Sequence, residues 1–212
     1  MADKVLITAG PTREPIDPVR FISNRSSGKM GAALAAAARD AGFDTVLVCG
    51  PVAIDLPQGV EIRRVETAEE MAREVHAAAP ECRIVIMAAA VADYRPIEVF
   101  DQKLKKLPGN LVIELERTED ILASLGQNRQ PGQTLVGFAA ESENLLANAE
   151  SKLRRKNLDW IAANLVSDGF AKDTDKVELI GRGGERHTLG PASKREIAAE
   201  LIRIVSHASK RE

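Results

Sequence analysis

The sequence lacks an excess of charge of one sign, a long apolar run and an N-terminal export signal. The formal net charge is −2, from 29 Lys and Arg against 31 Asp and Glu. This balance argues against a general binder of nucleic acid or membrane surfaces, whose affinity comes from excess positive charge. No apolar run approaches the length of a membrane span, and no secretory signal precedes the first predicted strand. We therefore expect a cytoplasmic protein with no nucleic-acid or membrane partner.

The chain is also poor in the residues that form disulfides and metal clusters. Its two cysteines, Cys49 and Cys82, lie in the apolar runs VLVCG and CRIVIM. Buried, reduced thiols are the expected reading for such positions, rather than a disulfide or a metal site. The three histidines are scattered along the chain and suggest neither a metal cluster nor a Ser–His or Cys–His nucleophile. The sequence therefore assigns no metal ligands.

The order of apolar segments predicts one α/β domain over residues 1–212. Repeated alternation of strand-like and helix-like segments favours a mainly parallel sheet with helices on both faces. The expected strands are 5–9, 45–49, 60–65, 83–90, 111–115 (an edge strand), 134–140 and 160–164. The expected helices are 28–41, 68–78, 120–125, 144–156 and 192–206.

Two polar regions interrupt this alternation. Residues 95–110 contain two prolines and the run KLKK, and a loop of this length is often a lid. Residues 168–189 carry two short apolar runs around GRGGER, a pattern that predicts an added β-hairpin.

The segment from Gly10 to Gly31 is the strongest candidate for a binding site. It joins the first predicted strand to the first predicted helix and is rich in Arg, Ser, Asn and Gly. Serines before a helix predict either an ordinary capped helix or a phosphate site, and spacing alone does not separate the two. Met30 occupies the position where a P-loop needs Ser or Thr, and the short Gly-x-Gly-x-x-Gly turn of dinucleotide folds is missing. A standard P-loop or NAD site is therefore not expected.

Three further constellations have both a structural and a functional reading. The alanines of MAAAVADYR are either small core residues or a wall close to a ligand, with Asp93 and Tyr94 at the end of the strand. The lysines of KLKK are either a solvated charge run or a cover for phosphates. Lys152 and Lys156 share one helix face, which is either a basic solvent face or part of a site.

Five motifs together resemble the phosphopantothenate–cysteine ligase (phosphopantothenoylcysteine synthetase) family. They are GPTREPIDPVRFISNRSSGKMG, AAVADYRP, KLKK, GFAAES and KNLDWIAAN, and the resemblance covers nearly the whole chain. It implies a Rossmann-like fold, a homodimer, and CTP and Mg²⁺ as co-substrate and metal. It also implies a reaction in which CTP activates 4'-phosphopantothenate as an acyl-cytidylate. L-cysteine then forms the amide and CMP leaves.

The resemblance implies roles for particular residues. Asn24 matches the residue that binds the acyl-cytidylate, Arg20 one needed for its conversion, and Lys103 one on the loop that closes over it. Ala89 matches a small residue beside the nucleotide. The implied CTP-site residues are Gly10, Ser26, Ser27, Gly28, Met87, Asp93, Lys103, Glu119, Asp120, Ile121, Leu122, Phe138, Lys152 and Lys156. Glu119-Asp120 stands where the family usually has Pro-Asp.

The resemblance also bears on partners and leaves alternatives open. Bacterial members are commonly the C-terminal half of a bifunctional protein whose other half is a flavin-dependent phosphopantothenoylcysteine decarboxylase. We expect this chain to be a stand-alone synthetase or one such half, dimerising through the added hairpin. The alternatives are an ATP-dependent ligase, an NAD(P)-binding Rossmann oxidoreductase and a nucleotide-binding module without catalysis.

Overall fold

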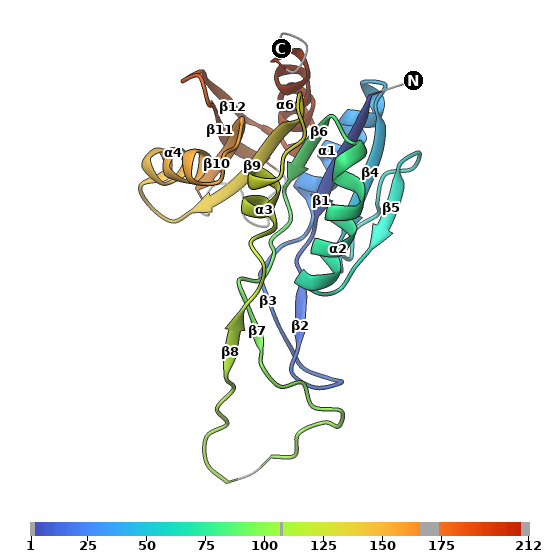
Figure 1. Cartoon of the computed structure of the whole chain (residues 1–212), viewed down its shortest axis with the longest axis vertical. Coiled ribbons are helices and arrows are strands. Elements are labelled where there is room, and N and C mark those ends of the chain that lie inside the picture. The colour runs from blue at the N-terminus through green and yellow to red at the C-terminus, as the bar shows by residue number, and fades with distance from the viewer. Residues whose placement is uncertain (1–2, 107, 166–173, 209–212) are drawn as a thin grey trace.

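The fold is a three-layered α/β structure built around one large sheet (Figure 1). The computed structural model describes residues 3–106, 108–165 and 174–208, and the statements below concern those residues. The eight strands of the sheet have the order β12-β11-β10-β9-β6-β1-β4-β5. They are β1 (Lys4–Ala9), β4 (Asp44–Cys49), β5 (Glu61–Arg64), β6 (Ile84–Met87), β9 (Thr134–Glu141), β10 (Trp160–Leu165), β11 (Thr174–Gly181) and β12 (Arg186–Ser193). Neighbouring strands pair in parallel except for β10–β11 and β11–β12, so only β11 runs against the other strands of the sheet, and the predicted fold class is confirmed.

Helices cover both faces of the sheet because its central strands are apolar on both sides. Val5 and Ile7 of β1 pack with α1 (Lys29–Asp40) and α6 (Lys194–Ala208), whereas Leu6 belongs to the core on the opposite face. That second core contains α2 (Ala68–Ala78), α3 (Ile121–Gln127) and α4 (Leu145–Arg155), and a short 3₁₀ turn (Ala79–Glu81) follows α2. In the described part of the chain, none of the helices has the length and apolar character needed to cross a bilayer.

The sheet changes its winding direction between β1 and β6, which are hydrogen-bonded neighbours. From β1 the chain passes through α1 to β4 on one side, and from β6 it passes through α3 to β9 on the other. Connections that leave in opposite directions open a crevice at the carboxyl ends of the two strands, where ligands of open α/β sheets bind.

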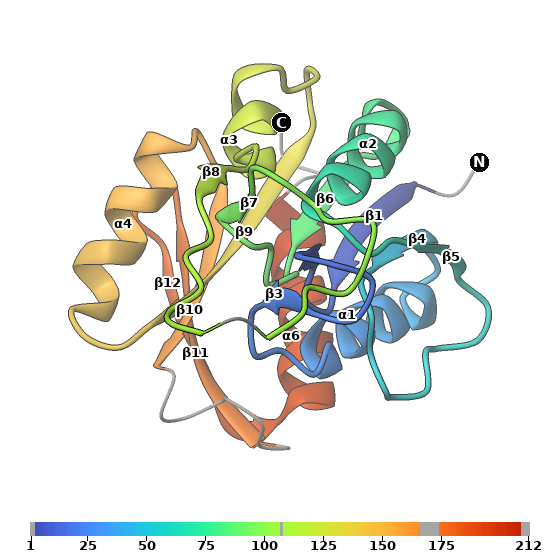
Figure 2. The same cartoon turned by 90° about the horizontal axis from the view of Figure 1, so that it is seen from below.

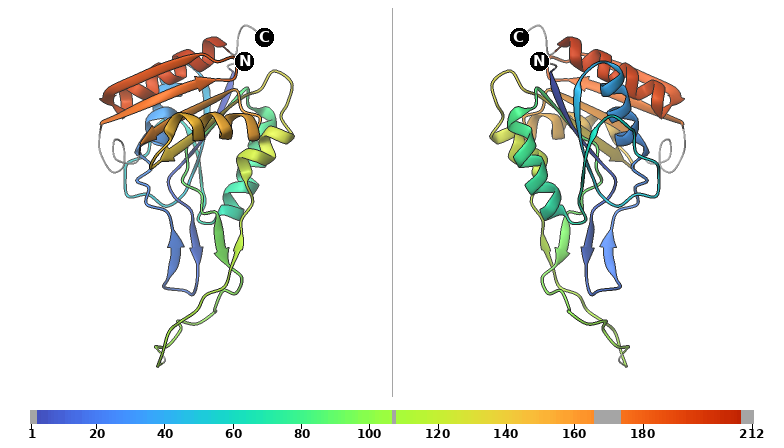
Figure 3. Two further views of the ribbon diagram at one scale, coloured as in Figure 1. Left: turned by 90° about the vertical axis from the view of Figure 1, so that its left-hand side faces the viewer. Right: turned by 90° about the vertical axis from the view of Figure 1, so that its right-hand side faces the viewer.

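Two small antiparallel ribbons extend from the same end of the sheet (Figures 1 and 3). One consists of β2 (Arg13–Pro15) and β3 (Phe21–Ser23), and lies between β1 and α1. The other consists of β7 (Tyr94–Pro96) and β8 (Leu115–Arg117), and lies between β6 and α3. We call the two ribbons with their connecting loops, residues 11–23 and 94–117, the arm.

The structure corrects several element predictions. The expected edge strand at 111–115 is wrong: β8 begins at Leu115 and pairs with β7, away from the main sheet. The strand expected at 83–90 leaves the sheet after Met87, because Ala90 pairs with Pro11 of the arm instead. The predicted lid region lies in the arm, where residues 97–114 join β7 to β8.

The predicted hairpin is present and is joined to the main sheet. Strand β11 pairs antiparallel with both β10 and β12, so the hairpin forms one edge of the large sheet. The first part of the predicted region, residues 168–173, lies outside the described residues.

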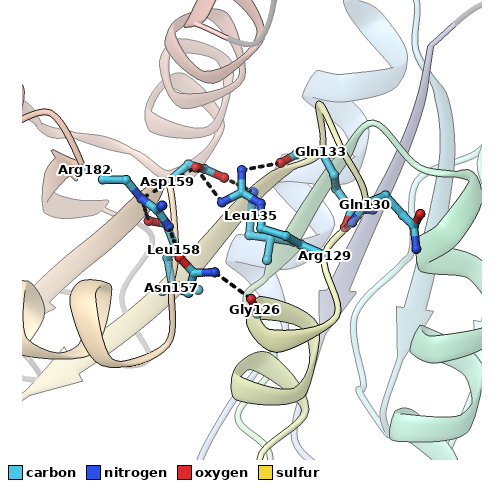
Figure 4. A network of polar contacts seen from close by, with 9 residues as sticks. All are labelled: Gly126, Arg129, Gln130, Gln133, Leu135, Asn157, Leu158, Asp159 and Arg182. Carbon is cyan, nitrogen blue, oxygen red and sulfur yellow. Dashed lines mark hydrogen bonds and ion pairs between the residues drawn. The ribbon is translucent and has the colours of Figure 1, made fainter. Parts of the chain in front are cut away.

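A polar network fixes the ends of α3 and α4 against the sheet (Figure 4). The Asp159 carboxylate accepts hydrogen bonds from the Leu135 amide at 2.8 Å and from Arg129 at 3.0 Å. Asn157 donates to the Gly126 carbonyl at 2.7 Å, and Arg182 donates to the Asn157 side chain, also at 2.7 Å. The network therefore joins α3, α4, β9 and the hairpin, and it anchors the end of α4 from which Lys156 extends.

Candidate functional site

A pocket of about 1070 Å³ lies at the carboxyl ends of the central strands. Figure 2 looks along the arm toward this end of the sheet. The pocket is lined by four chain segments, residues 24–31, 87–94, 117–122 and 138–140, which follow β3, β6, β8 and β9 or lie near their ends. Further side chains complete the lining: Lys152, Lys156, Asn164, Asp175, Val177 and Lys194.

The first wall of the pocket is the start of α1. The helix begins after Gly28, which has φ +75° and supplies no side-chain cap, so a serine-capped helix, one of the two alternatives left open by the sequence, is not what the structure has. Ser26 instead accepts a hydrogen bond from the Gly28 amide at 3.3 Å. A helix start without a side-chain cap presents backbone N–H groups and the positive end of the helix dipole. This geometry supports the phosphate interpretation of the loop over the capped-helix one.

Gly31 brings this helix start close to β1. A Cβ atom on Gly31 would lie 2.5 Å from the Ala9 Cβ and 2.8 Å from the Thr8 carbonyl oxygen. Only glycine fits such an approach, and the close packing places the first turn of α1 directly over the end of the strand.

The second wall is the chain that follows β6. The Asn24 amide nitrogen donates to the carbonyl oxygens of Val91 at 2.9 Å and Ala90 at 3.3 Å. On the other side, buried Thr8 accepts from the Ala89 amide and buried Thr12 from the Ala92 amide, both at 3.0 Å. The backbone of this alanine-rich segment is therefore held on both sides, with its small side chains along the pocket.

The third wall is the turn before α3, which carries two paired carboxylates. Glu119 contacts His76 of α2 at 2.6 Å, and Asp120 contacts Lys156 of α4 at 2.7 Å. Asp120 also accepts from the Ala123 amide at 3.1 Å, which makes it the N-cap of α3. Burial alone raises the pKa of the Asp120 carboxyl, but the hydrogen bonds from Lys156 and Ala123 outweigh it and hold the pKa below its ordinary value.

Lys152 of α4 is held against the sheet. Its ammonium group donates to the Phe138 carbonyl oxygen at 2.9 Å. Burial lowers the pKa of Lys152, and the nearby charge of Lys156 lowers it further, against the opposing carboxylates. The pocket therefore contains a partly desolvated cation, which interacts more strongly with an anion than a solvated one.

The pocket contains most of the residues predicted from the sequence. Those that line it are Asn24, Ser26, Ser27, Gly28, Met87, Ala89, Asp93, Glu119, Asp120, Ile121, Leu122, Phe138, Lys152 and Lys156. Three predicted residues do not line it. Gly10 lies behind Gly28, where a Cβ would come 2.8 Å from the side chain of Val52. Arg20 and Lys103 belong to the arm.

Several lining residues were missed by the sequence analysis. Asn164 donates to the Asp175 carboxylate at 3.2 Å, and both side chains reach the pocket from β10 and β11. Arg117, Thr118 and Lys194 line it as well. Asn164 ends the motif KNLDWIAAN, so a signal existed, whereas nothing in the sequence places Lys194 beside the first loop.

The described residues hold no group of three or more His, Cys, Asp or Glu side chains arranged to bind a metal ion. A Mg²⁺ ion bound with a nucleotide needs fewer protein ligands, because it retains waters and is held by phosphates with one or two carboxylates. Asp93, Glu119 and Asp120 supply carboxylates at the pocket, and the last two are already paired. The donor set thus fits a Mg²⁺ ion that arrives on phosphates.

Comparisons with known proteins give a consistent result. The model of the family described as "DNA/pantothenate metabolism flavoprotein C-terminal domain" matches residues 1–208. The chain is 45% identical over 210 residues to the coenzyme A biosynthesis bifunctional protein CoaBC of Bacillus subtilis (strain 168), covering 97% of this chain and 52% of that protein. It is 46% identical over 206 residues to a protein named cysteine/cysteine sulfinic acid decarboxylase from an unknown prokaryotic organism, covering 95% and 57%.

A solved structure agrees with the sequence relatives. The crystal structure of the C-terminal domain of CoaBC superimposes with a TM-score of 0.86 at 42% identity, covering 99% of this chain and 97% of that one. The chain spans about half the length of the curated relatives that it matches.

The environment of Lys152 leads to a prediction that does not depend on function. We expect its ammonium group to lose its proton at a lower pH than an ordinary lysine with a pKa of 10.5, because burial disfavours the charged form. An NMR titration of ¹³C-labelled lysine side chains measures this, and Lys152→Arg assigns the signal. Titration of Lys152 at or above 10.5 would contradict the described environment.

Proposed function

The chain belongs to the family of the DNA/pantothenate metabolism flavoprotein C-terminal domain, and from this premise we propose that it is a phosphopantothenate–cysteine ligase domain of coenzyme A biosynthesis. It would join 4'-phosphopantothenate to L-cysteine through a CTP-derived acyl-cytidylate. The observation that carries the proposal is the combination of groups in one pocket. The start of α1 and Lys152 suit phosphates, and the turn of Glu119 and Asp120 offers hydrogen-bond acceptors.

The proposed reaction has two steps. A carboxylate oxygen of 4'-phosphopantothenate attacks the α-phosphorus of CTP, and the bond to pyrophosphate breaks. The amine of cysteine then attacks the acyl carbon, the bond to CMP breaks, and the nitrogen loses a proton. Neither step needs a protein nucleophile, so the chain would act by positioning the reactants and stabilising charge.

The residues divide this work according to their place in the pocket. The first-turn amides of α1 and the Lys152 ammonium would hold phosphate oxygens, and Lys156 lies beside them. The α-phosphate and the activated carboxylate would meet beside Asn24 and Ala89, because Asn24 binds the segment after β6 and Ala89 belongs to it. Mg²⁺ on the phosphates would offset the charge that builds up on the leaving pyrophosphate.

The direct test is turnover with defined substrates. The protein with 4'-phosphopantothenate, L-cysteine, Mg²⁺ and CTP should release pyrophosphate and CMP in step with amide formation. ATP in place of CTP tests the ATP-dependent alternative, and omission of cysteine should leave a bound acyl-cytidylate. Absence of amide with either nucleotide would refute the ligase, and NADPH binding without turnover would favour the oxidoreductase.

Asn24 offers a sharper prediction. An aspartate at this position places a carboxylate against the carbonyl oxygens of Ala90 and Val91, where the amide now donates. It would also repel a phosphate, so we expect Asn24→Asp to lower kcat by about 100-fold, as for loss of one oxyanion donor.

The matched control for this variant is Asn128→Asp. Asn128 also donates to a backbone carbonyl, that of Ser124 at 3.0 Å, but it is not among the residues that line the pocket. Its substitution should leave turnover within about twofold of the wild type, as for surface changes with small effects. Equal turnover of Asn24→Asp and the control would remove Asn24 from the proposed mechanism.

We also propose that the protein is a homodimer, with its contact on the arm. Large exposed apolar side chains gather there: Val19, Phe21, Tyr94, Ile97, Val99, Leu111, Val112 and Leu115. In the described part of the hairpin the large apolar side chains are buried, so the earlier expectation of a hairpin contact has less support. Large apolar side chains left exposed on one part of a protein mark an interaction site.

A matched pair of variants tests this contact. Leu115 on the arm and Leu146 on α4 are 43% and 40% exposed, so aspartate at either site should change the fold of the monomer little. We expect Leu115→Asp to weaken self-association by about tenfold or more, because it buries a carboxylate in an apolar contact. Sedimentation equilibrium measures the effect, and equal association of the two variants would place the contact elsewhere.

The relatives' greater length suggests a covalent or separate partner. Because the chain spans about half of the bifunctional CoaBC proteins, we propose that a flavin-dependent phosphopantothenoylcysteine decarboxylase would take up its product.

A further inference from the structure

A buried carboxylate in the arm has no role in the proposed mechanism so far. Asp17 lies in the turn between β2 and β3, and its side chain is 0% exposed. One carboxylate oxygen accepts from the amides of Val19 at 2.9 Å and Arg20 at 2.8 Å. The other accepts from the Arg20 guanidinium, through Nε at 2.9 Å and through Nη2. Asp17 therefore fixes both the backbone and the side chain of Arg20.

The same carboxylate holds the neighbouring loop. The Leu104 amide donates to Asp17 Oδ2 at 3.1 Å, and the Leu104 carbonyl oxygen accepts from Arg20 Nη2 at 3.2 Å. The amide and the carbonyl group of Leu104 are thus both bound by the Asp17–Arg20 pair. A further hydrogen bond joins the Phe100 amide to the Ile16 carbonyl oxygen at 3.0 Å. This loop is therefore docked, through Phe100 and Leu104, onto the turn that carries Arg20.

The chemistry of the pair explains why the loop is held there. A buried carboxylate is costly unless a cation and hydrogen-bond donors compensate it. Arg20 supplies the charge, and the Leu104 amide supplies one of the donors. Hydrogen bonds from these groups, with burial opposing them, hold the pKa of Asp17 well below its ordinary value. Release of the loop would remove a donor from a desolvated charge.

The location of this pair matters because of what it connects. Lys103 immediately precedes Leu104, and the side chain of Arg20 is 41% exposed. We propose that Asp17 is a positioning residue that joins Arg20 and the Lys103 loop into one unit, so that both cations reach the activated substrate together. This inference rests on the proposed ligase function. It assigns Asp17 no contact with substrate.

The proposal separates two parts of the reaction. The pocket that would bind the nucleotide is lined by neither Asp17, Arg20 nor Leu104. Loss of the Asp17 carboxylate should therefore leave the KM for CTP within about twofold, while it lowers kcat by about 100-fold, the scale of a displacement of about 1 Å. A merely structural role would lower thermal stability and leave both kinetic constants of the folded fraction unchanged.

The experiment compares Asp17→Asn with Asp101→Asn, which changes an exposed carboxylate on the loop that carries Lys103. Hydrogen exchange at the Leu104 amide is the first readout and needs no turnover. We expect exchange to become about tenfold faster in Asp17→Asn, as for loss of one hydrogen bond, and to stay unchanged in the control. Unchanged exchange in Asp17→Asn would overturn the docking.

Steady-state kinetics supply the second readout, with Lys103→Gln and the double variant. If Asp17 acts through the loop, the double variant should be no slower than the slower single variant, whereas independent roles would multiply the two losses. Multiplied losses, or wild-type kcat in Asp17→Asn, would overturn the inference. If the wild type forms no amide at all, the proposed function fails, while the exchange result still decides the docking.

A second variant, Arg20→Lys, tests the same inference if Asp17→Asn does not fold. Arg20→Lys retains the positive charge beside Asp17 but cannot provide the same fork of donors to Asp17 and the Leu104 carbonyl. It should therefore also speed exchange at the Leu104 amide. Wild-type protection of the Leu104 amide in a folded Arg20→Lys protein would show that Arg20 does not help to hold the loop.

Discussion

The rest of the structure depends on the hydrogen bonds at the carboxyl ends of β1 and β6, two parallel strands that are neighbours in the sheet. Beyond the last ladder hydrogen bond their backbone amides need other acceptors. Thr8 and Thr12 supply them with side-chain oxygens, each 3.0 Å from an amide of the alanine-rich segment, and the Ala90 amide donates to the Gly10 carbonyl at 2.9 Å. The two segments that follow β1 and β6 therefore run side by side past the edge of the sheet. One side of this pair of segments forms a wall of the pocket, and the arm continues from the end of the pair.

The arm and the pocket differ in how they are stabilised. The pocket walls are anchored to the sheet and to helices through the hydrogen bonds to Thr8 and Thr12, through Gly31 and through the network around Asp159. The outer arm has two short ribbons, exposed apolar side chains, and the hydrogen bonds to Asp17 and Ile16. Regions with few buried contacts open at lower free energy than cores do. The two cations expected to handle the intermediate, Arg20 and Lys103, belong to this less firmly held part.

The sequence predicted the sheet and helices well because their apolar periodicity is strong. The helix expected at 68–78 has those bounds in the structure, where Thr67 and Glu70 form a capping box. The ribbons were missed because each strand has three residues, which is too short for a period, and because a long loop separates β7 from β8. Pro15 and Pro96 also argue against strands. Most of the residues that the resemblance assigned line the pocket. Thr8 and Thr12 act instead through the backbone amides of Ala89 and Ala92, a role that the sequence does not reveal.

The loop from Gly10 to Gly31 can serve two purposes because it closes on itself. Gly10 and Gly28 have φ values of +76° and +75°, and a Cβ on either would meet the side chain of Val52. A Cβ on Gly28 would also lie 3.4 Å from the Gly10 backbone. The chain thus leaves at one glycine, passes along the arm, and returns beside its starting point. The start of α1 is held by the contact between Gly28 and Gly10 and by the close packing of Gly31 on β1, and neither of these involves the arm. One continuous loop can therefore carry both proposed roles, phosphate binding at α1 and handling of the acyl group by Arg20, at two separately held places.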